Sequence, residues 1–283
     1  MAGSATNLCV VLKDGRATCM RGGQERPFPP FRVPDLRFSN LYVHEQGVCG
    51  DTVDGKPECF TVDGWTQASV VAGAKAAYPA PLATLSLMPD GHIEVRGHDW
   101  AKEQVPAARY TKLCGGGRWI SQTDELLANS QRHVHACALA EDGHIVCWGD
   151  TPKVPPGTFV DILCGADFVC GLTANKRMIC MNRKGDKEES EPGQELVNFA
   201  SDGRYFGGAL TKADERGWAV TRSYLFEYDG TQPYPEKGLF TAFWMGADSE
   251  CGKRPSGETI CWGRGVKTLQ IPPSVKLPVH ADR

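Results

Sequence analysis

The sequence predicts an all-β fold, a single seven-bladed β-propeller domain over residues 1–283, from three observations. First, 32 glycines and 19 prolines are too many for a helical protein and too dispersed for a disordered one. Second, a hairpin-like segment recurs about every forty residues, which is a usual spacing of propeller blades. Third, residues 275–282 resemble the strand that precedes each hairpin but have no hairpin after them.

The recurring segment predicts a β-hairpin. In its clearest copy, Cys137–Gly149, two runs of alternating apolar residues flank Asp142 and Gly143. Glycine supplies the positive φ that a tight turn requires. Five copies begin and end with cysteine, and two keep the shape without it. The copies begin near residues 9, 49, 85, 137, 170, 208 and 251.

A second β-like run precedes each hairpin by about six residues, and the two together make a propeller blade. Proline-rich pieces such as 27–30 and 152–156 follow the hairpins. Because proline cannot donate to a β-ladder, these pieces suit an outer edge strand or a connection between blades. The clearest inner strands are expected at Phe159–Gly165, Tyr110–Gly115, Ala68–Gly73 and Thr241–Gly246.

The two ends of the chain predict a closed ring. The N-terminus enters at a hairpin, Asn7–Cys9, with no inner strand before it. Residues 275–282 align with residues 160–167, which belong to an inner strand. A C-terminal strand that completes the first blade would leave no open sheet edge at that point.

Ten of the twelve cysteines form five pairs, and the two members of each pair are ten positions apart. Such residues face each other across a hairpin with Cα atoms about 5.5 Å apart, which a disulfide can bridge. In the other copies both positions are lost together, Leu85 with Val95 and Gly208 with Val220, as expected of a bridge. Metal binding and reduced, buried thiols are the alternatives. The predicted disulfides are Cys9–Cys19, Cys49–Cys59, Cys137–Cys147, Cys170–Cys180 and Cys251–Cys261.

The remaining cysteines, Cys114 and Cys164, each precede a glycine at the end of an inner strand, in consecutive blades. Three interpretations are open: a small residue is needed there, the pair supplies free thiols near the channel, or it bridges two blades. The hairpin disulfides alone imply an oxidising compartment, because disulfides are rare in the cytosol. We therefore expect a secreted or periplasmic protein.

Composition and motifs exclude several classes of protein. The net charge is −3 and no run of Lys or Arg exceeds two residues, so the basic footprint of a nucleic-acid binder is missing. No apolar stretch approaches the roughly 18 residues of a membrane span. No cofactor is predicted, because nucleotide-binding glycine, Gly-x-Ser-x-Gly and His-Glu-x-x-His motifs are absent. His133 and His135 share a strand face, but no third metal ligand lies nearby in sequence, so no metal is predicted.

The order of inner strand ending in Gly, Cys-x-Leu, Asp-Gly and Cys-Trp-Gly resembles the repeat of the regulator of chromosome condensation (RCC1) superfamily. The match is closest over residues 134–149, 159–172 and 241–263. The Trp-Gly pair survives at Trp148 and Trp262, whose indoles are expected to pack between blades. The resemblance implies a seven-bladed propeller, and the fold alone transfers no function. Secreted bacterial members, such as the propeller-type β-lactamase inhibitory protein, are the nearest in character and imply binding through loops at one end of the ring.

Irregularities in the repeat mark candidate sites, because a propeller gathers equivalent positions of all blades around its axis. Several inner strands end in glycine. At the equivalent position, other blades carry titratable side chains. These groups either are solvated at a wet pore or form a pocket for ligand binding or acid–base catalysis. The candidate catalytic residues are His44, Glu45, Asp202, His280, Cys114 and Cys164.

The largest departure from the repeat is an insertion, residues 116–133, in blade four. Long loops on a rigid scaffold often carry binding function, and an idle surface loop is the alternative. Tryptophans at a rim are typical interface anchors or stacking platforms for sugars. The candidate binding residues are Arg118, Trp119, Asp124, Glu125, Trp65 and Trp100.

Two functional hypotheses follow. The leading one is a secreted binding protein that recognises a protein partner, with a glycan second, through loops on one face of the propeller, including inhibitor-like action. The alternative is an enzyme with a small-molecule active site in the central funnel. Cys114 and Cys164 discriminate between them, since a reactive thiolate favours the enzyme and inert sulfurs favour binding.

Overall fold

The structure is a computed structural model, and its described part is all-β, as the sequence predicts. In that part there is no helix, and hence none that meets the length and hydropathy needed to cross a membrane. The described residues are 2–3, 7–11, 14–21, 36–44, 47–61, 70–80, 83–97, 105–117, 134–190, 192–201, 206–212, 220–222, 239–246 and 249–262.

The strands form seven antiparallel sheets, each made of strands consecutive in the sequence. The first four sheets contain β1 (Ala2–Gly3), β2 (Asn7–Val11) and β3 (Ala17–Arg21); β4 (Phe38–His44), β5 (Gly47–Thr52) and β6 (Pro57–Thr61); β7 (Ala76–Ala80), β8 (Ala83–Leu87) and β9 (Ile93–Gly97); and β10 (Tyr110–Gly117), β11 (Val134–Ala140) and β12 (Ile145–Gly149). The last three contain β13 (Asp161–Cys164), β14 (Phe168–Leu172), β15 (Met178–Asn182) and β16 (Lys187–Glu189); β17 (Leu196–Ser201), β18 (Phe206–Leu210) and β19 (Val220–Arg222); and β20 (Ala242–Gly246), β21 (Ser249–Lys253) and β22 (Thr259–Trp262).

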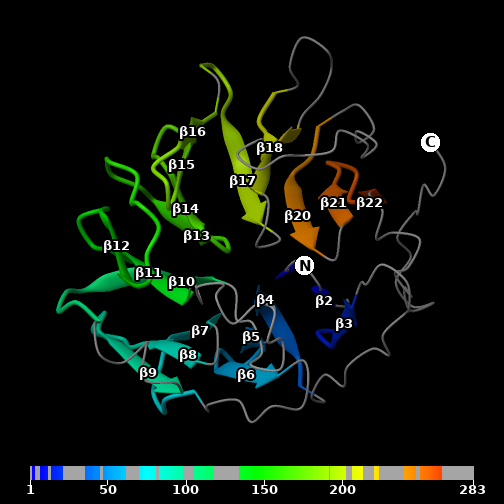
Figure 1. Ribbon diagram of the computed structural model, residues 1–283. Coiled ribbons are helices and arrows are strands. Elements are labelled where there is room, and N and C mark those ends of the chain that lie inside the picture. Colours follow the sequence, from blue (N-terminus) through cyan, green and yellow to red (C-terminus); the bar gives the residue numbers. More distant parts are fainter. Residues whose placement is uncertain are drawn as a thin grey trace, which may run out of the picture.

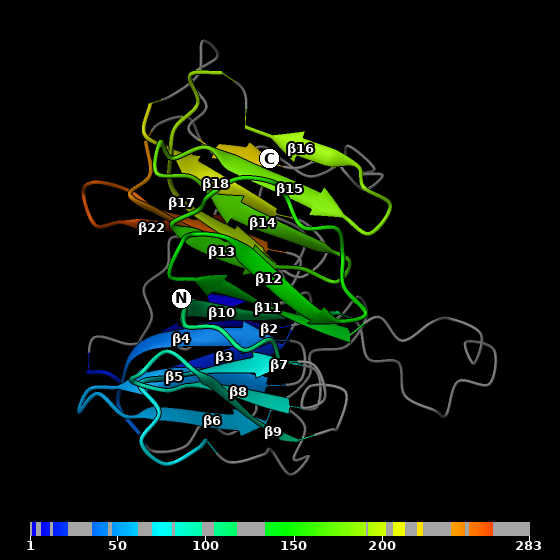
Figure 2. The same ribbon diagram turned by 90° about the vertical axis from the view of Figure 1, so that its left-hand side faces the viewer.

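The sheets are arranged around a common centre, with the first strand of each sheet innermost (Figure 1). Each sheet contacts the sheet that follows it in the sequence, and β20 of the last sheet contacts β1 of the first. A view from the side shows successive sheets stacked against one another (Figure 2). This arrangement brings the innermost strands of sheets far apart in the sequence to a shared central space.

The hairpin registers follow the predicted cysteine pairs. Each of the five pairs is directly opposed across its hairpin and is disulfide-bonded. Their Cα atoms are 4.0–4.1 Å apart, not the expected 5.5 Å. The expected distance belongs to a hydrogen-bonded pair, whereas the closer approach is typical of a non-hydrogen-bonded pair. The tight turns are confirmed as well, since Gly143 and Gly257 have φ of 85° and 87°.

A second repeat, which the sequence analysis missed, involves the residue after the first cysteine of a hairpin. In several sheets this residue is glycine, and a large side chain at the start of the sheet's own inner strand packs against it. A Cβ added to Gly171 would lie 2.2 Å from the Phe159 ring, and one added to Gly252 would lie 2.3 Å from the Phe240 ring. The same contact joins Gly50 with Phe38 and Gly208 with Leu196.

This contact corrects the predicted register of the sixth sheet. Gly208 is opposite Thr221, not Val220, and it occupies the position equivalent to Gly171. The residue that replaces the first cysteine is therefore Gly207, which is opposite Arg222. The predicted pair was displaced by one residue on the first strand and by two on the second, because the hairpin of this sheet has no cysteine to mark the register.

The predicted inner strand of the third sheet was wrong. Residues 70–75 contain a turn in which Gly73 has φ of 84°, and the inner strand is β7. β7 contains Pro79, which is opposite Thr84 within the ladder. An innermost strand has one edge facing the central space, and proline is tolerated on such an edge.

The N-terminus also differs from the prediction. The first hairpin does have a strand before it, because β1 pairs with β2 and places Ala2 opposite Cys9. The position reserved for residues 275–282 beside β2 is thus taken by β1. Residues 275–282 themselves lie outside the described residues, and the predicted place for them beside β2 is filled by β1.

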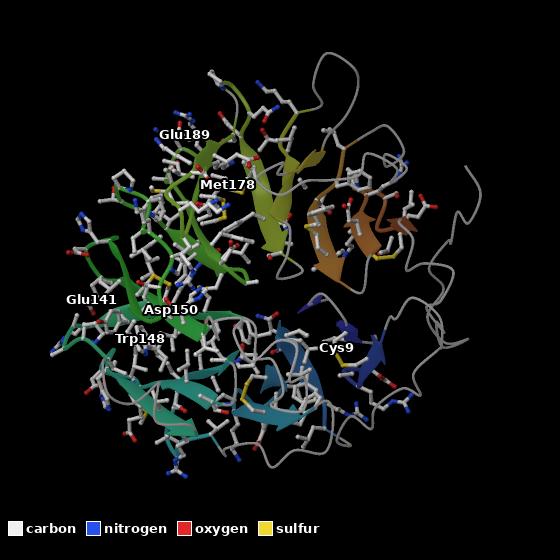
Figure 3. The ribbon with its side chains drawn as sticks, viewed as in Figure 1. Cys9, Glu141, Trp148, Asp150, Met178 and Glu189 are labelled. Carbon is white, nitrogen blue, oxygen red and sulfur yellow. A yellow bond between two sulfur atoms is a disulfide. The ribbon has the colours of Figure 1, made fainter. Side chains whose placement is uncertain are left out.

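The hydrophobic core is divided among the interfaces between neighbouring sheets. Buried clusters join the first sheet to the second, the third to the fourth, and each later sheet to the next up to the seventh. Trp148 is 2% exposed and belongs to the cluster between the third and fourth sheets, as predicted, and Figure 3 shows side chains filling this space. The side chain of Trp262 lies outside the described part.

We predict that Gly171→Ala destabilises the protein by about 1–3 kcal/mol, because the new methyl group overpacks against Phe159. Urea unfolding monitored by tryptophan fluorescence measures the change. In a Phe159→Ala background the same substitution should cost much less, since the ring is gone. An equal cost in both backgrounds would contradict the contact as the source of the effect.

Candidate functional site

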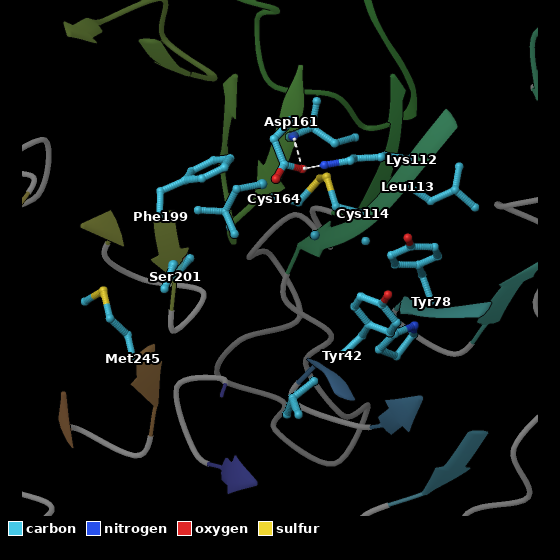
Figure 4. Close-up of a pocket in the computed structure, with 18 of the residues that line it drawn as sticks. Tyr42, Tyr78, Lys112, Leu113, Cys114, Asp161, Cys164, Phe199, Ser201 and Met245 are labelled. Carbon is cyan, nitrogen blue, oxygen red and sulfur yellow. Dashed lines mark hydrogen bonds and ion pairs between the residues drawn. A yellow bond between two sulfur atoms is a disulfide. The ribbon is translucent and has the colours of Figure 1, made fainter. Parts of the chain in front are cut away.

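The inner strands of the second to seventh sheets enclose a cavity of about 580 Å³ (Figure 4). This volume lies within the range of about 300–1,000 Å³ that is common for small-molecule sites. The wall is contributed by β4, β7, β10, β13, β17 and β20. The central space between the sheets is therefore a real cavity with a defined side-chain lining.

Two sets of equivalent positions supply much of the lining. We call the first set the cysteine row, because its members are directly opposed to the first cysteine of the hairpin or to its replacement. The cysteine row comprises Tyr42, Tyr78, Cys114, Leu163, Ala200 and Trp244. We call the second set the polar row, since its members stand two residues earlier and carry polar side chains. The polar row comprises Asn40, Lys112, Asp161 and Asn198.

Tyr42 and Tyr78 join the second and third sheets at one side of the cavity. Their ring centroids are 4.5 Å apart with the planes inclined by 42°. Tyr78 donates a hydrogen bond to the phenol oxygen of Tyr42, which donates in turn to Asp51 Oδ2 at 3.1 Å. Asn40 Nδ2 also donates to the Tyr42 oxygen, at 3.0 Å. The phenol of Tyr42 is thereby fully occupied, and its ring is held in place.

Burial decides the protonation states in this network. Desolvation raises the pKa of both phenols, and the negative charge of Asp51 raises the pKa of Tyr42 further. Desolvation also raises the pKa of the Asp51 carboxyl, although the hydrogen bond from Tyr42 acts in the opposite direction. Both tyrosines therefore stay neutral over the physiological pH range, because a phenol already ionises only near pH 10 in water.

Lys112 and Asp161 form an ion pair between the fourth and fifth sheets on another side of the cavity, as the dashed line in Figure 4 marks. Lys112 Nζ lies 2.8 Å from Asp161 Oδ1, and the two side chains are 40% and 38% exposed. The backbone N–H of Ile162 donates to the same oxygen. A pair this exposed contributes at most about 1 kcal/mol to stability, so its main effect here is on the charge of the cavity.

Cys114 and Cys164 form a sixth disulfide, which joins the fourth and fifth sheets in the cavity wall. Their Cα atoms are 5.5 Å apart and 50 residues apart in sequence. Of the three interpretations, the bridge between blades is the one the structure contains. The assignment of these cysteines as catalytic thiols is therefore wrong for this state, because a sulfur in a disulfide cannot act as a thiolate nucleophile.

The described residues contain one cluster with metal-ligand chemistry, made of His135, Cys137 and Cys164. Their ligand atoms lie within 4.8 Å of one another, and all three residues are buried. Both sulfurs belong to disulfides, and zinc binds cysteine as the thiolate. The oxidised protein therefore cannot use this cluster as a zinc site. His133, the partner of His135 in the sequence analysis, lies outside the described residues.

The other predicted site residues are mostly not described. His44 is the last residue of β4 and is opposite Gly47, but its side chain is not described. Among the candidate catalytic residues whose side chains the structure describes, Cys114 and Cys164 are brought together. The predicted residues outside the described part are Glu45, Asp202, His280, Arg118, Trp119, Asp124, Glu125, Trp65 and Trp100.

The described fold is similar to solved structures of extracellular domains. The CRINKLY WD40 ectodomain of the Arabidopsis thaliana receptor kinase ACR4 matches with a TM-score of 0.63 and 19% identity over 92% of this chain and 91% of that chain. The ectodomain of the Physcomitrella patens receptor kinase CR4 matches with a TM-score of 0.60 and 19% identity over 94% and 72%. These likenesses show the fold. It is a β-propeller.

Two further findings concern the superfamily of the chain. Yeast RCC1 (Prp20), solved with Kap60, is also similar, but with a TM-score of 0.45 and 11% identity over 94% of this chain and 70% of that chain, it adds nothing to the argument. No protein-family model matches the sequence, and no curated protein matches it. The propeller fold is thus established by structural likeness, and the choice of superfamily is not.

The sequence analysis missed most of the cavity-lining side chains, although a signal for them exists. Tyr42 is opposite Cys49, and Trp244 is opposite Cys251. Counting back from the first hairpin cysteine would have led to the cysteine row, and two residues further to the polar row. The predicted candidates came instead from the ends of the inner strands, where some blades have glycine and others have titratable residues.

We predict that loss of the Cys114–Cys164 bridge costs more stability than loss of a hairpin bridge. Chain-entropy arguments give about 4 kcal/mol for the long loop closed by Cys114 and Cys164 and about 3 kcal/mol for the short Cys170–Cys180 loop. Two double variants are compared. One combines Cys114→Ala with Cys164→Ala, and the other combines Cys170→Ala with Cys180→Ala. Both are unfolded in urea without reductant. A smaller loss for the first variant would contradict the prediction.

We also predict a pH-dependent stability difference at Asp51. Because its pKa is raised in the folded protein, the unfolded chain loses this proton first as the pH rises above the ordinary value of about 3.9. The carboxyl therefore stabilises the folded state below that pH and loses this contribution above it. Relative to Asp51→Asn, the unsubstituted protein should lose stability as the pH rises from below the ordinary pKa through the raised pKa of Asp51. Thermal unfolding of both proteins across this range tests the sign, and a constant difference would refute it.

Proposed function

We propose that this chain is an exported, seven-bladed β-propeller of the RCC1-like type that recognises a protein partner. The insertion 116–133 would supply the contact surface, and the disulfide-braced ring would hold it. The observation that carries the proposal is the position of the insertion's root at the cavity wall. An inhibitor-like action, in which this surface covers a partner's functional site, belongs to the same proposal.

A closed ring of seven blades is supported by the contacts between sheets. The described strands give seven sheets, and β20 of the last one contacts β1 of the first. The order of Cys-x-Leu and Cys-Trp-Gly in the hairpins supports an RCC1-like repeat. Each sheet buries apolar side chains against its neighbour, as propeller blades do.

Export is supported by the cysteine chemistry. All twelve cysteines fall in the described residues and are paired in six disulfides. Disulfides persist in secreted, periplasmic and other extracytosolic proteins and are rare in the cytosol. The two structural neighbours with the higher TM-scores are ectodomains of receptor kinases, which is consistent with this location.

Partner binding is supported by how the insertion is attached. The insertion begins at the end of β10, where Gly115, Gly116 and Gly117 line the cavity. The Gly117 N–H donates to the Gly165 carbonyl at 3.0 Å, and the Cys114–Cys164 disulfide joins the same two sheets just before it. A long segment with such a fixed root is suited to present Arg118, Trp119, Asp124 and Glu125 as an interface.

The enzyme alternative has less support. It relied on thiols at Cys114 and Cys164, and these sulfurs form a disulfide. The acidic side chain among the described lining residues, Asp161, is also engaged, in an ion pair with Lys112. We therefore favour binding without chemistry.

The proposal is tested by exchanging the insertion. Residues 118–133 are replaced by a Gly/Ser segment of equal length, and the matched control carries Lys253→Ala on β21, in the seventh sheet and not in the fourth, from which the insertion starts. Both proteins, exported and immobilised, are cross-linked to proteins of the extracellular fraction and analysed by mass spectrometry. We expect a partner retained by the unsubstituted and control proteins and lost by the exchange. Identical retention by all three would refute the role of the insertion.

A further inference from the structure

We propose that the central cavity binds an uncharged sugar ring. This site is distinct from the interface assigned to the insertion, and it rests only on the described lining of the cavity. The ligand is a neutral pyranose, either free or at the end of a glycan carried by a partner. Three properties of the lining lead to this class: its charge balance, its aromatic walls and an unused hydrogen-bond acceptor.

The charge balance favours a neutral ligand. Among the described residues that line the cavity, the ionised side chains are Lys112 and Asp161, and these neutralise each other at 2.8 Å. Tyr42 and Tyr78 remain protonated, since burial disfavours their ionised form. A phosphate or carboxylate ligand would have to compete with Asp161 for Lys112, and a cationic ligand would have to compete with Lys112 for Asp161. A neutral ligand meets neither penalty.

The aromatic walls favour a ring with apolar faces. Tyr42 and Tyr78 lie at one side of the cavity, and Phe199 lies across from them (Figure 4). Trp244 adds a fourth, half-buried ring to the lining. The C–H groups on the face of a pyranose pack on such rings while its hydroxyls project from the edge. The rings of Tyr42 and Tyr78 are already held by their hydrogen-bond network, so little side-chain freedom is lost on binding.

An unused acceptor favours a ligand with O–H donors. Both contacts of Asp161 fall on Oδ1, which leaves Oδ2 without a partner in the described structure. The Asp161 side chain is 38% exposed and lines the cavity, so a ligand hydroxyl can donate to Oδ2, and a hydrogen bond to a charged acceptor is stronger than one to a neutral acceptor. Several hydroxyls around one ring are the feature that distinguishes a sugar from other neutral ring compounds.

The inference is tested by saturation-transfer NMR on the full chain with a panel of single-ring probes. The panel contains the methyl pyranosides of glucose, galactose and mannose, together with glucuronic acid, glucosamine and uridine. We expect transfer to at least one neutral pyranoside, with affinity at least about tenfold higher than for either charged analogue or for the nucleoside. No transfer to any neutral pyranoside, or preference for a charged or nucleoside probe, would overturn the proposal.

Charge variants supply a sharper control than loss of binding. Lys112→Met leaves Asp161 unneutralised and should shift the preference toward glucosamine, whereas Asp161→Asn leaves Lys112 unneutralised and should shift it toward glucuronic acid. Both side chains are partly exposed, so the folded state should tolerate these changes. Thermal unfolding verifies this. Opposite shifts place the sugar beside this ion pair, and unchanged preferences in folded variants would refute the site.

The two sources of the sugar are separated by a further measurement. If the cavity reads a glycan on a partner, the free pyranoside should compete with a glycoprotein that carries the same terminal sugar, and enzymatic removal of that sugar should abolish capture. If the free sugar is the ligand, no such competition occurs. Exchange of residues 118–133 should leave pyranoside binding unchanged, so failure of the proposed interface and failure of the sugar site are distinguishable.

Discussion

The register of the hairpins is the constraint on which the rest of this structure depends. Opposed cysteines fix that register in five sheets. In several sheets, a glycine next along the hairpin also contacts a large side chain from the start of the inner strand. The inner strands of the second to seventh sheets pair with their hairpins in the same register, so their equivalent residues meet around one cavity.

Within this common frame, neighbouring inner strands are joined in different ways. Tyr42 and Tyr78 connect the second and third sheets through contact between their tilted rings and a hydrogen-bond chain to Asp51. Cys114, at the equivalent position of the fourth sheet, connects to the fifth through a disulfide. Lys112 and Asp161 connect the same two sheets through an ion pair. A repeat that is uniform in backbone thus supports a cavity with distinct chemistry on each side.

Much of the fold could be predicted from the sequence because its signals are local. The Asp-Gly turn at Gly143 and the ten-residue cysteine spacing predicted the hairpins, which the structure contains. The third inner strand was missed because residues 68–73 share the apolar run ending in glycine that marks other inner strands, whereas Gly73 lies in a turn and the strand is β7. The register of the sixth sheet was missed because a residue opposite Gly207 cannot be identified without a cysteine. The cavity lining was missed because it depends on cross-strand pairing, which places Tyr42 and Trp244 at equivalent positions despite unlike surroundings in sequence.

The most direct test of this account is a map of the disulfides in the exported, non-reduced protein. Digestion without reductant, followed by mass spectrometry, identifies which cysteine-containing peptides are linked. The account predicts a peptide pair joined through Cys114 and Cys164, because this bridge requires consecutive inner strands to meet at one wall of the central cavity. Free thiols at these two positions, or a link from Cys114 to any other cysteine, would contradict the arrangement of the sheets around the cavity.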